Sequence, residues 1–477
     1  MWAMSDTSPI LLWFRRDLRL SDHPALAKAC DSGRPVIPVF IHDGIVADTG
    51  AAARMRWGMS IAAHADALQD KNNRLILRRG PALEVLRELA EETGAGAVWW
   101  SRLYDPDCVE RDTRVKEGLT DDGLDARSFD GHLLFEPWTV ETKSGGFYKV
   151  FTPMWRAVRE RELPGTTAAP SKIAGPGTWP DSDDLDEWKM GDAMDRGAPI
   201  VRPWCTVGEE AAQQRLATFI QHRLSDYETN RDLPAKKDGT SGLSENLTCG
   251  EISPLACWHA GQRQVGEGSK DAETFLQELV WREFAYHLIY HTPRIATDNW
   301  REKWDDFDWN TDERKAEVKA WKQGRTGIKF VDAAMRELYV TGTMHNRGRM
   351  IVASYLTKHL RCDWRIGQRW FQDCLIDWDP ASNAMGWQWS AGSGPDATPY
   401  FRVFNPVTQL DRFDKDRAYV DTWIAEGQDD PPKTALSYFE AIPKHWSMSA
   451  DDPYPDPIVD ADEGRKAALA AYDDFKE

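Results

Sequence analysis

The stretch DWDPASNAMGWQWSAGSG, residues 377–394, concentrates side chains that could do chemistry. It holds three Trp, two Asp and one Asn, but it contains no His, Cys or Lys. The usual acid–base and nucleophilic groups are therefore missing from it. The whole chain is also rich in tryptophan, with 23 in 477 residues. Such an excess can serve packing alone, but it also suits a task that needs an electron-rich indole.

The same stretch predicts a helix. Asp379 followed by Pro380 is typical of a helix cap with Pro at the first helical position. If the helix continues past Gly386, Asn383 and Trp387 lie one above the other on one face. Trp389, two residues further on, then faces a different neighbourhood. If the helix ends at Gly386, this alignment is lost.

Two further stretches could bind a ligand. In RDLPAKKDGTSGLSENLTCGEISP, residues 231–254, hydroxyl groups cluster around Gly242 before a helical segment, which suits either a phosphate site or a plain helix cap. In FLQELVWREF, Glu278 and Trp281 are three residues apart and share a helix face. They suit either stacking of a flat heterocycle or a solvated carboxylate beside a packing indole.

A third stretch, GTMHNRGRM, places Asn346 and Met350 four residues apart, with Arg349 on the same side of a predicted helix. The alternative to a binding site is an ordinary helix with a charged face.

The elements that carry these residues fall into three regions. Residues 1–135 alternate apolar strands with helices, which predicts a Rossmann-like α/β domain with a parallel five-stranded sheet. No GxGxxG follows the first strand, which argues against a nicotinamide site and a light-independent oxidoreductase. Residues 136–204 are rich in Gly, Pro, Ser and Asp and predict an interdomain linker. Residues 205–477 have helical periodicity and predict an all-helical domain.

Composition limits the functional classes. The net charge of −18 disfavours nucleic-acid binding, because phosphate contacts need Lys and Arg. It does not exclude such binding, because net charge says little about the charge of a local groove. The seven Cys include no CxxC pair, which predicts neither a disulfide framework nor a metal site. No signal peptide or membrane span is expected. We therefore expect a cytoplasmic protein with no membrane association.

Six motifs in order resemble those of the photolyase/cryptochrome family, over roughly residues 10–425. They are WFRRDLRLSDHPAL, TSGLS, ELVWREF, MHNRGRM, DWDPASNAMGWQW and PYFRVFNP. The resemblance implies an α/β domain, a long linker and a helical domain that holds FAD. It is strongest to the class I cyclobutane pyrimidine dimer photolyases.

The resemblance implies a role for each matching position. Flavin-binding residues would be Tyr227, Thr240, Ser241, Gly242, Leu243, Ser244, Phe275, Arg349, Asp377, Trp378, Asp379 and Asn383, with an Arg349–Asp377 ion pair at the pyrimidine edge and Asn383 at N5. Trp387, Trp364 and Trp309 would relay electrons to the flavin. Catalytic residues would be Glu278, Asn346, Met350, Asn383 and Arg349. DNA contacts would come from Arg231, Glu278, Trp281, Asn346, Arg347, Trp389 and Arg402, with Trp281 and Trp389 cradling the dimer.

The implied reaction is light-dependent DNA repair. Photoexcited reduced FAD would give an electron to a pyrimidine dimer in UV-damaged DNA, the dimer would split, and the electron would return. A monomer is expected. The alternatives are a cryptochrome-type blue-light sensor without repair and a DASH-type relative that prefers single-stranded DNA.

An antenna chromophore is expected in the N-terminal domain. Glu110 matches a carboxylate that contacts a folate in some relatives, which favours 5,10-methenyltetrahydrofolate. The neighbouring LYDP stretch leaves 8-hydroxy-5-deazaflavin as the alternative.

Overall fold

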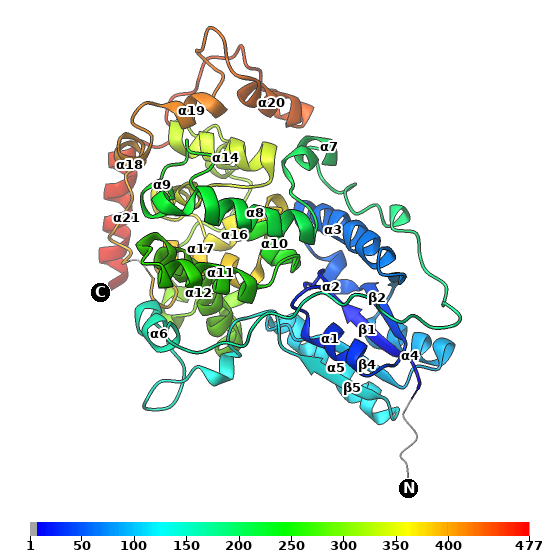
Figure 1. The fold of residues 1–477 in the computed structure, drawn as a ribbon. Helices are drawn as coiled ribbons and strands as arrows, with labels where there is room; N and C mark the ends of the chain where they lie inside the picture. The colour runs from blue at the N-terminus through cyan, green and yellow to red at the C-terminus, as the bar shows by residue number, and fades with distance from the viewer. Residues whose placement is uncertain (1–6, 398, 477) are drawn as a thin grey trace.

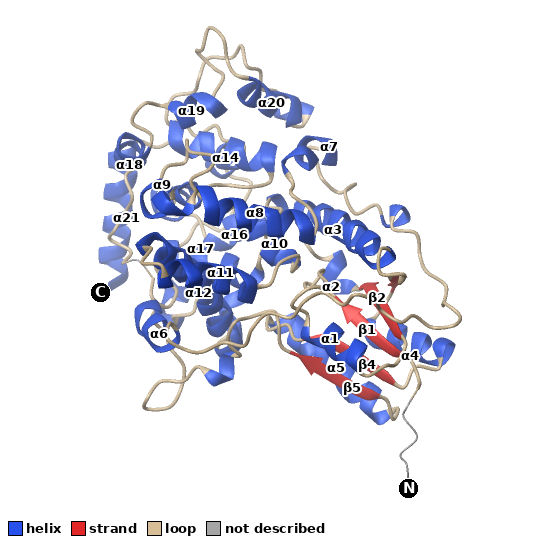
Figure 2. Ribbon diagram, viewed as in Figure 1, coloured by secondary structure: helices blue, strands red, loops and turns tan. Residues whose placement is uncertain are grey.

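The computed structural model describes residues 7–397 and 399–476. The strands gather in one part of the molecule, and the rest is almost entirely helical (Figure 2). All strands are parallel and lie in the order β3-β2-β1-β4-β5. Their bounds are β1 (Ile10–Phe14), β2 (Val36–His42), β3 (Ile76–Arg79), β4 (Ala97–Ser101) and β5 (Asp125–Phe129). The five-stranded parallel sheet expected from the sequence is therefore present.

The helices around the sheet follow the strands in turn, as a βα alternation requires. They are α1 (Pro24–Asp31), α2 (Gly44–Ala47), α3 (Ala51–Gln69), α4 (Ala82–Thr93) and α5 (Pro106–Asp121). β1 reads ILLWF and is wholly buried, because helices cover both faces of a parallel sheet. The chain then passes through α6 (Phe151–Val158) and α7 (Ala198–Val201) into the helical part (Figure 1).

The helical part begins near residue 209. Its helices are α8 (Glu209–His222), α9 (Tyr227–Asn230), α10 (Ser244–Cys249), α11 (Pro254–Gly266), α12 (Lys270–His291), α13 (Ala316–Lys322), α14 (Lys329–Thr341), α15 (Asn346–Ser354), α16 (Trp364–Cys374), α17 (Pro380–Ala391), α18 (Pro406–Phe413), α19 (Ala418–Trp423), α20 (Lys433–Ala441) and α21 (Ala461–Lys476). Within the described residues, no helix has the length and apolar character needed to cross a membrane.

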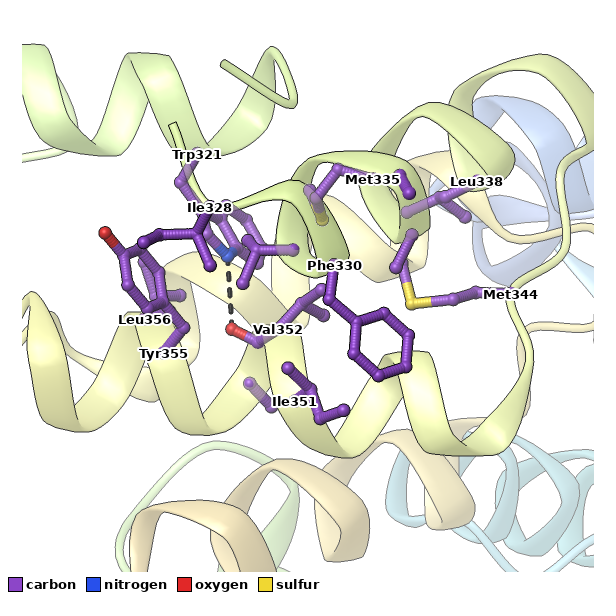
Figure 3. Close-up of a cluster of buried hydrophobic side chains, with 14 of the residues drawn as sticks. Trp321, Ile328, Phe330, Met335, Leu338, Met344, Ile351, Val352, Tyr355 and Leu356 are labelled. Atoms are coloured by element: carbon purple, nitrogen blue, oxygen red, sulfur yellow. Dashed lines mark hydrogen bonds between the residues drawn. The ribbon is translucent and has the colours of Figure 1, made fainter. Parts of the chain in front are cut away.

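A large apolar core holds α14 against α15. Figure 3 shows Phe330 and Met335 of α14 facing Ile351 of α15. The fully buried Trp321 anchors this core, and its indole N–H donates to the carbonyl of Val352 at 3.1 Å. A buried indole N–H needs such a partner, because leaving it unpaired would cost its desolvation energy.

A buried charge network joins the sheet domain to the helical part. The guanidinium of Arg56 on α3 donates to Glu245 of α10 at 2.9 Å and to both carboxylate oxygens of Glu251 at 3.0 and 2.6 Å. Arg56 and Glu251 have no solvent exposure. A buried arginine needs partners on every side of its planar fork, and these two carboxylates supply them.

We expect Arg56→Leu to destabilise the protein by about 3–5 kcal/mol, because it leaves the buried Glu251 without its cation and leaves Glu245 with Arg215 alone. Chemical denaturation followed by circular dichroism measures the loss. Arg54→Leu on the same helix is the control, since the partly exposed Arg54 bonds only to the carbonyl of Ala47 among the described residues. An equal loss in both variants would contradict the argument.

Candidate functional site

A cavity of about 220 Å³ lies among the helices and is lined by residues that are far apart in the sequence. Of the predicted flavin residues, it brings together Tyr227, Ser241, Leu243, Ser244, Phe275, Arg349, Asp377 and Asp379. The predicted catalytic residue Glu278 lines the same cavity. The motifs TSGLS, ELVWREF, MHNRGRM and DWDP therefore meet around one space, as a shared ligand site requires.

The lining also includes residues that the sequence analysis missed, namely Leu247, Thr248, Leu279, Arg282 and Ser382. Leu247 and Thr248 follow the TSGLS motif on α10, and Leu279 and Arg282 neighbour Glu278 on α12. Helical spacing from the predicted residues could have indicated them.

An ion pair lies at one side of this cavity. Arg349 on α15 donates to both oxygens of Asp377 at 3.0 and 2.7 Å. The same guanidinium donates to the carbonyl of Met344 at 2.9 Å, which fixes its orientation. The Arg349–Asp377 pair predicted from the resemblance is therefore present, while its contact with a flavin stays a prediction.

Asp379 is held by two donors. Its carboxylate caps α17 by accepting from the amide of Ser382 at 2.8 Å, as the Asp–Pro pattern predicts. Its other oxygen accepts from the hydroxyl of Tyr286 at 2.6 Å. Burial, followed by the nearby Asp379 carboxylate, raises the pKa of Tyr286 well above its usual value, so the phenol stays a donor. Tyr286 lies on α12, and no local pattern indicates this contact.

The segment from 377 to 383 forms a wall between two spaces. Asp377, Asp379 and Ser382 face the 220 Å³ cavity. Trp378, Pro380 and Asn383 instead line a larger cleft of about 1250 Å³ between the helical part and the sheet domain. Two of the predicted flavin residues, Trp378 and Asn383, are thus on the cleft side. Thr240 and Gly242 line neither of these two spaces.

Polar atoms without a protein partner lie on this wall. Among the described residues, Oδ1 of Asn383 and Nε1 of Trp378 are buried and have no hydrogen-bond partner. The amide nitrogen of Asn383 donates to the carbonyl of Gln368 at 3.1 Å. Buried polar atoms are usually paired, so unpaired ones beside a cavity indicate groups that a ligand could satisfy. Together with the hydroxyls of Ser241 and Ser244, this set of hydrogen-bond donors and acceptors fits FAD.

The predicted catalytic and DNA-binding residues pair with one another. Arg231 contacts Glu278 at 2.7 Å, and Arg347 contacts Asp232 at 2.7 Å. Burial raises the pKa of Glu278, and the charge of Arg231 opposes that rise. The resemblance implies DNA contacts for both Arg231 and Glu278, and no local pattern in the sequence indicates that they contact each other.

The other predicted lesion contacts come from α12, α15, α17 and the loop before α18. The amide of Asn346 approaches Sδ of Met350 at 3.9 Å on α15. Trp281 on α12 and Trp389 on α17 are half-buried, and Arg402 is exposed in the loop before α18. α17 continues through Gly386 to Ala391, so Trp387 and Trp389 do face different surroundings. Trp387 is only 2% exposed.

The three predicted relay tryptophans differ in their surroundings. Trp364 is fully buried, and its indole N–H donates to Asn299 at 2.8 Å. Trp309 is partly buried beside Trp304, with ring centroids 6.1 Å apart. Trp387 packs against Trp321 with ring centroids 6.1 Å apart, and this neighbour was not predicted. The relay order stays a prediction.

The predicted antenna residue Glu110 lines the large cleft. Its exposed carboxylate lies 3.8 Å from Arg114, one helical turn further along α5. The cleft also receives Asp43, Arg111 and the ends of β2 and β3, where parallel sheets commonly bind ligands.

Gly367 on α16 fixes the position of Trp387, because an added Cβ would overlap the indole ring. We expect Gly367→Ala to cost about 1–3 kcal/mol of stability through overpacking. Gly386→Ala on α17 is the matched control, since its Cβ would meet no atom within 4 Å and alanine favours a helix. Denaturant unfolding of both variants measures the difference. A control that loses as much stability as Gly367→Ala would refute the role of the glycine.

Two family models match the chain. The FAD binding domain of DNA photolyase matches residues 275–474, and the DNA photolyase model matches residues 10–172. The first match contains Glu278, Arg349 and Asp377 of the cavity, and the second contains the sheet and Glu110. The first match thus falls within the part of the chain predicted to hold FAD, and the second contains the predicted parallel sheet.

Relatives match over nearly the full length. The deoxyribodipyrimidine photo-lyase of Agrobacterium fabrum is 46% identical over 473 residues, covering 98% of each chain. The crystal structure of a bacterial class III photolyase from Agrobacterium tumefaciens has a TM-score of 0.90 and 44% identity, covering 100% of this chain and 99% of that one. An archaeal photolyase from Sulfolobus tokodaii, solved with two FAD molecules, has a TM-score of 0.80 and 28% identity, covering 98% and 100%.

These relatives settle the family but not the subgroup. They include a class III structure, and the expected class I assignment is not confirmed. The relative from Agrobacterium fabrum is named for DNA repair, which supports repair over the cryptochrome-type alternative. With a full-length identity of 46%, the chain belongs to the DNA photolyase family.

Proposed function

We propose that this photolyase splits cyclobutane pyrimidine dimers in UV-damaged DNA, with FAD held in the 220 Å³ cavity and the adjoining space. The observation that carries the proposal is that Glu278 lines the same cavity as Arg349 and Asp377. A donor to the lesion and the polar partners of a flavin therefore share one space. Reduced FAD, when bound, supplies the electron on absorbing light.

In this proposal, the residues of the cavity bind FAD and fix its orientation. The Arg349–Asp377 pair would present a fixed cation and anion to the flavin's pyrimidine edge, and Asn383 would offer its unpaired amide oxygen near N5. Ser241 and Ser244 bind the phosphates, with Leu243 and Phe275 packing beside them. Trp387, Trp364 and Trp309 restore the reduced state by relaying electrons from the surface.

The lesion is held by the surface around Glu278. Trp281 and Trp389 stack on the extruded dimer, and Asn346 and Met350 contact it from α15. The phosphates on either side bind Arg231, Arg347 and Arg402, so binding weakens with added salt. Base flipping is a known property of photolyases, and extrusion costs little at a damaged step that is already poorly stacked.

The similarity to the Agrobacterium tumefaciens structure favours class III over class I. We also propose that the chain acts as a monomer in the cytoplasm, where its seven free thiols would stay reduced.

We place the antenna in the 1250 Å³ cleft beside Glu110. 5,10-Methenyltetrahydrofolate is favoured, with 8-hydroxy-5-deazaflavin as the alternative. A second FAD is a further candidate, because the Sulfolobus tokodaii photolyase was solved with two FAD molecules. The absorption spectrum of the chromophore extracted from the purified protein separates the three.

The direct test measures dimers in a defined oligonucleotide. We expect the reduced holoenzyme to remove dimers under blue light but not in darkness. Comparing duplex with single-stranded substrate also tests the DASH-type alternative. Absence of any light-dependent loss of dimers would overturn the proposed function.

Glu278 should give repair a specific pH dependence. Only the protonated carboxyl can donate to a carbonyl of the dimer, so the repair yield should fall as pH rises through the pKa of Glu278. Burial raises that pKa, which places the fall above the range of an ordinary glutamate. Arg231→Gln removes the cation that opposes the rise, so the midpoint should move to still higher pH.

Three variants complete this test, with repair measured at saturating DNA. Glu278→Gln keeps a neutral donor and should flatten the profile. Glu278→Ala should slow repair roughly tenfold to a hundredfold with FAD still bound, as expected for loss of a hydrogen bond to a charged group. Arg159→Gln, which breaks exposed ion pairs with Glu160 and Glu273, should leave the profile unchanged. A pH dependence of repair that persists in Glu278→Gln would exclude Glu278 as the donor to the dimer.

A further inference from the structure

A segment of the predicted linker runs along α12 in the direction opposite to the helix. The ring of Phe147 stacks on His291 with centroids 4.8 Å apart and planes 7° apart. The amide of the next residue donates to Nε2 of His287 at 3.0 Å. Phe151, the first residue of α6, then contacts Trp281 of α12. α6 lies beside α12 and away from the sheet (Figure 1). The linker is thus laid along the helix that carries the proposed lesion contacts.

Phe151 covers one face of the Trp281 indole. The two rings are parallel within 5°, and their centroids are 3.8 Å apart. Phe284 meets the same indole edge-on, at 5.7 Å and 76°. Phe151 is buried, whereas Trp281 is half-buried. Since Phe151 occupies one face, the opposite face is the one left for a flat ligand to stack on.

Phe151 is itself held from a third segment. Its amide donates to the carboxylate of Asp396 at 2.9 Å. Asp396 has a φ of +48°, a left-handed conformation that aspartate tolerates better than most residues. Asp396 lies in the loop between α17 and α18, which also carries Arg402. One short contact thus ties the linker to the loop that carries a proposed phosphate contact.

We propose that Phe151 is a positioning residue of the lesion pocket. It fixes the plane of the Trp281 indole so that the free face meets a pyrimidine dimer without first being ordered. An aromatic wall that is already ordered binds more tightly, because less side-chain freedom is lost on association. This inference rests on the proposed role of Trp281, and it makes the linker part of the substrate site.

The test compares binding of damaged and undamaged duplexes of one sequence to the holoenzyme, together with flavin content. Aromatic pairs contribute about 0.5–1.5 kcal/mol, so Phe151→Ala should raise Kd for the damaged duplex about two- to tenfold. The Kd for undamaged duplex and the flavin content should not change. Phe151→Tyr keeps the stack and should keep the wild-type ratio of the Kd for undamaged duplex to the Kd for damaged duplex. Phe151→Leu keeps the bulk without the stack and should not keep this ratio.

Phe147→Ala is the matched control. It removes a stack of the same kind from the same segment, about 15 Å along the helix axis from Trp281, since the two α12 partners are ten residues apart. It should leave the ratio of the two Kd values unchanged. A lower ratio for Trp281→Ala with an unchanged ratio for Phe151→Ala would overturn this inference alone.

An unchanged ratio for Trp281→Ala would instead overturn the proposed lesion pocket. If both Phe151→Ala and Phe151→Leu lost flavin, or if Phe147→Ala changed the ratio equally, Phe151 would be a general structural residue and the inference would fail.

Discussion

The contact of Arg56 with Glu245 and Glu251 is the constraint on which the rest of the site depends. Glu245 lies on α10, whose neighbouring residues Ser244 and Leu247 line the cavity. Because all three charged groups are buried, Arg56 and Glu251 cannot separate without leaving a charge uncompensated in a low-dielectric interior, while Glu245 is also held by Arg215 at 2.7 Å. Such a network adds little net stability compared with apolar packing, but it permits few alternative arrangements. The sheet domain thereby fixes the helix that bears Ser244, a proposed flavin contact.

The proposed lesion-facing surface also pairs acidic side chains with arginines, but these pairs are partly exposed and therefore weaker. Glu278 and Asp232 occupy positions next to Arg231 and Arg347 that DNA phosphates would take on binding. In the proposed complex, the acidic side chains would orient the arginines before DNA arrives, and the phosphates would displace them. This arrangement also reconciles a net charge of −18 with a proposed nucleic-acid partner, because the field at the site comes from a few placed cations.

Local signals in the sequence predicted more of the fold than of the contacts within the site. The Asp379–Pro380 pattern gave the start of α17, and the alternation of strands and helices gave the parallel sheet. The family resemblance indicated Arg349 and Asp377, which do form an ion pair. The Tyr286–Asp379 and Arg231–Glu278 contacts could not be predicted, because they join segments whose approach depends on tertiary packing. The packing of residues 147–151 on α12 was missed because Gly and Ser around them resembled a surface linker.

The wall formed by residues 377–383 has an evolutionary consequence. Alternate side chains of one short segment serve two compartments that share none of their lining residues. The larger compartment takes most of its surface from the sheet domain, whereas the smaller takes all of its surface from the helical part. Except at Trp378 and Asn383, which are proposed flavin contacts, substitutions in the larger compartment can therefore accumulate without changing the lining of the smaller one. If the proposed antenna and flavin sites are as assigned, most of the lining of each can thus diverge at its own rate within one inherited scaffold.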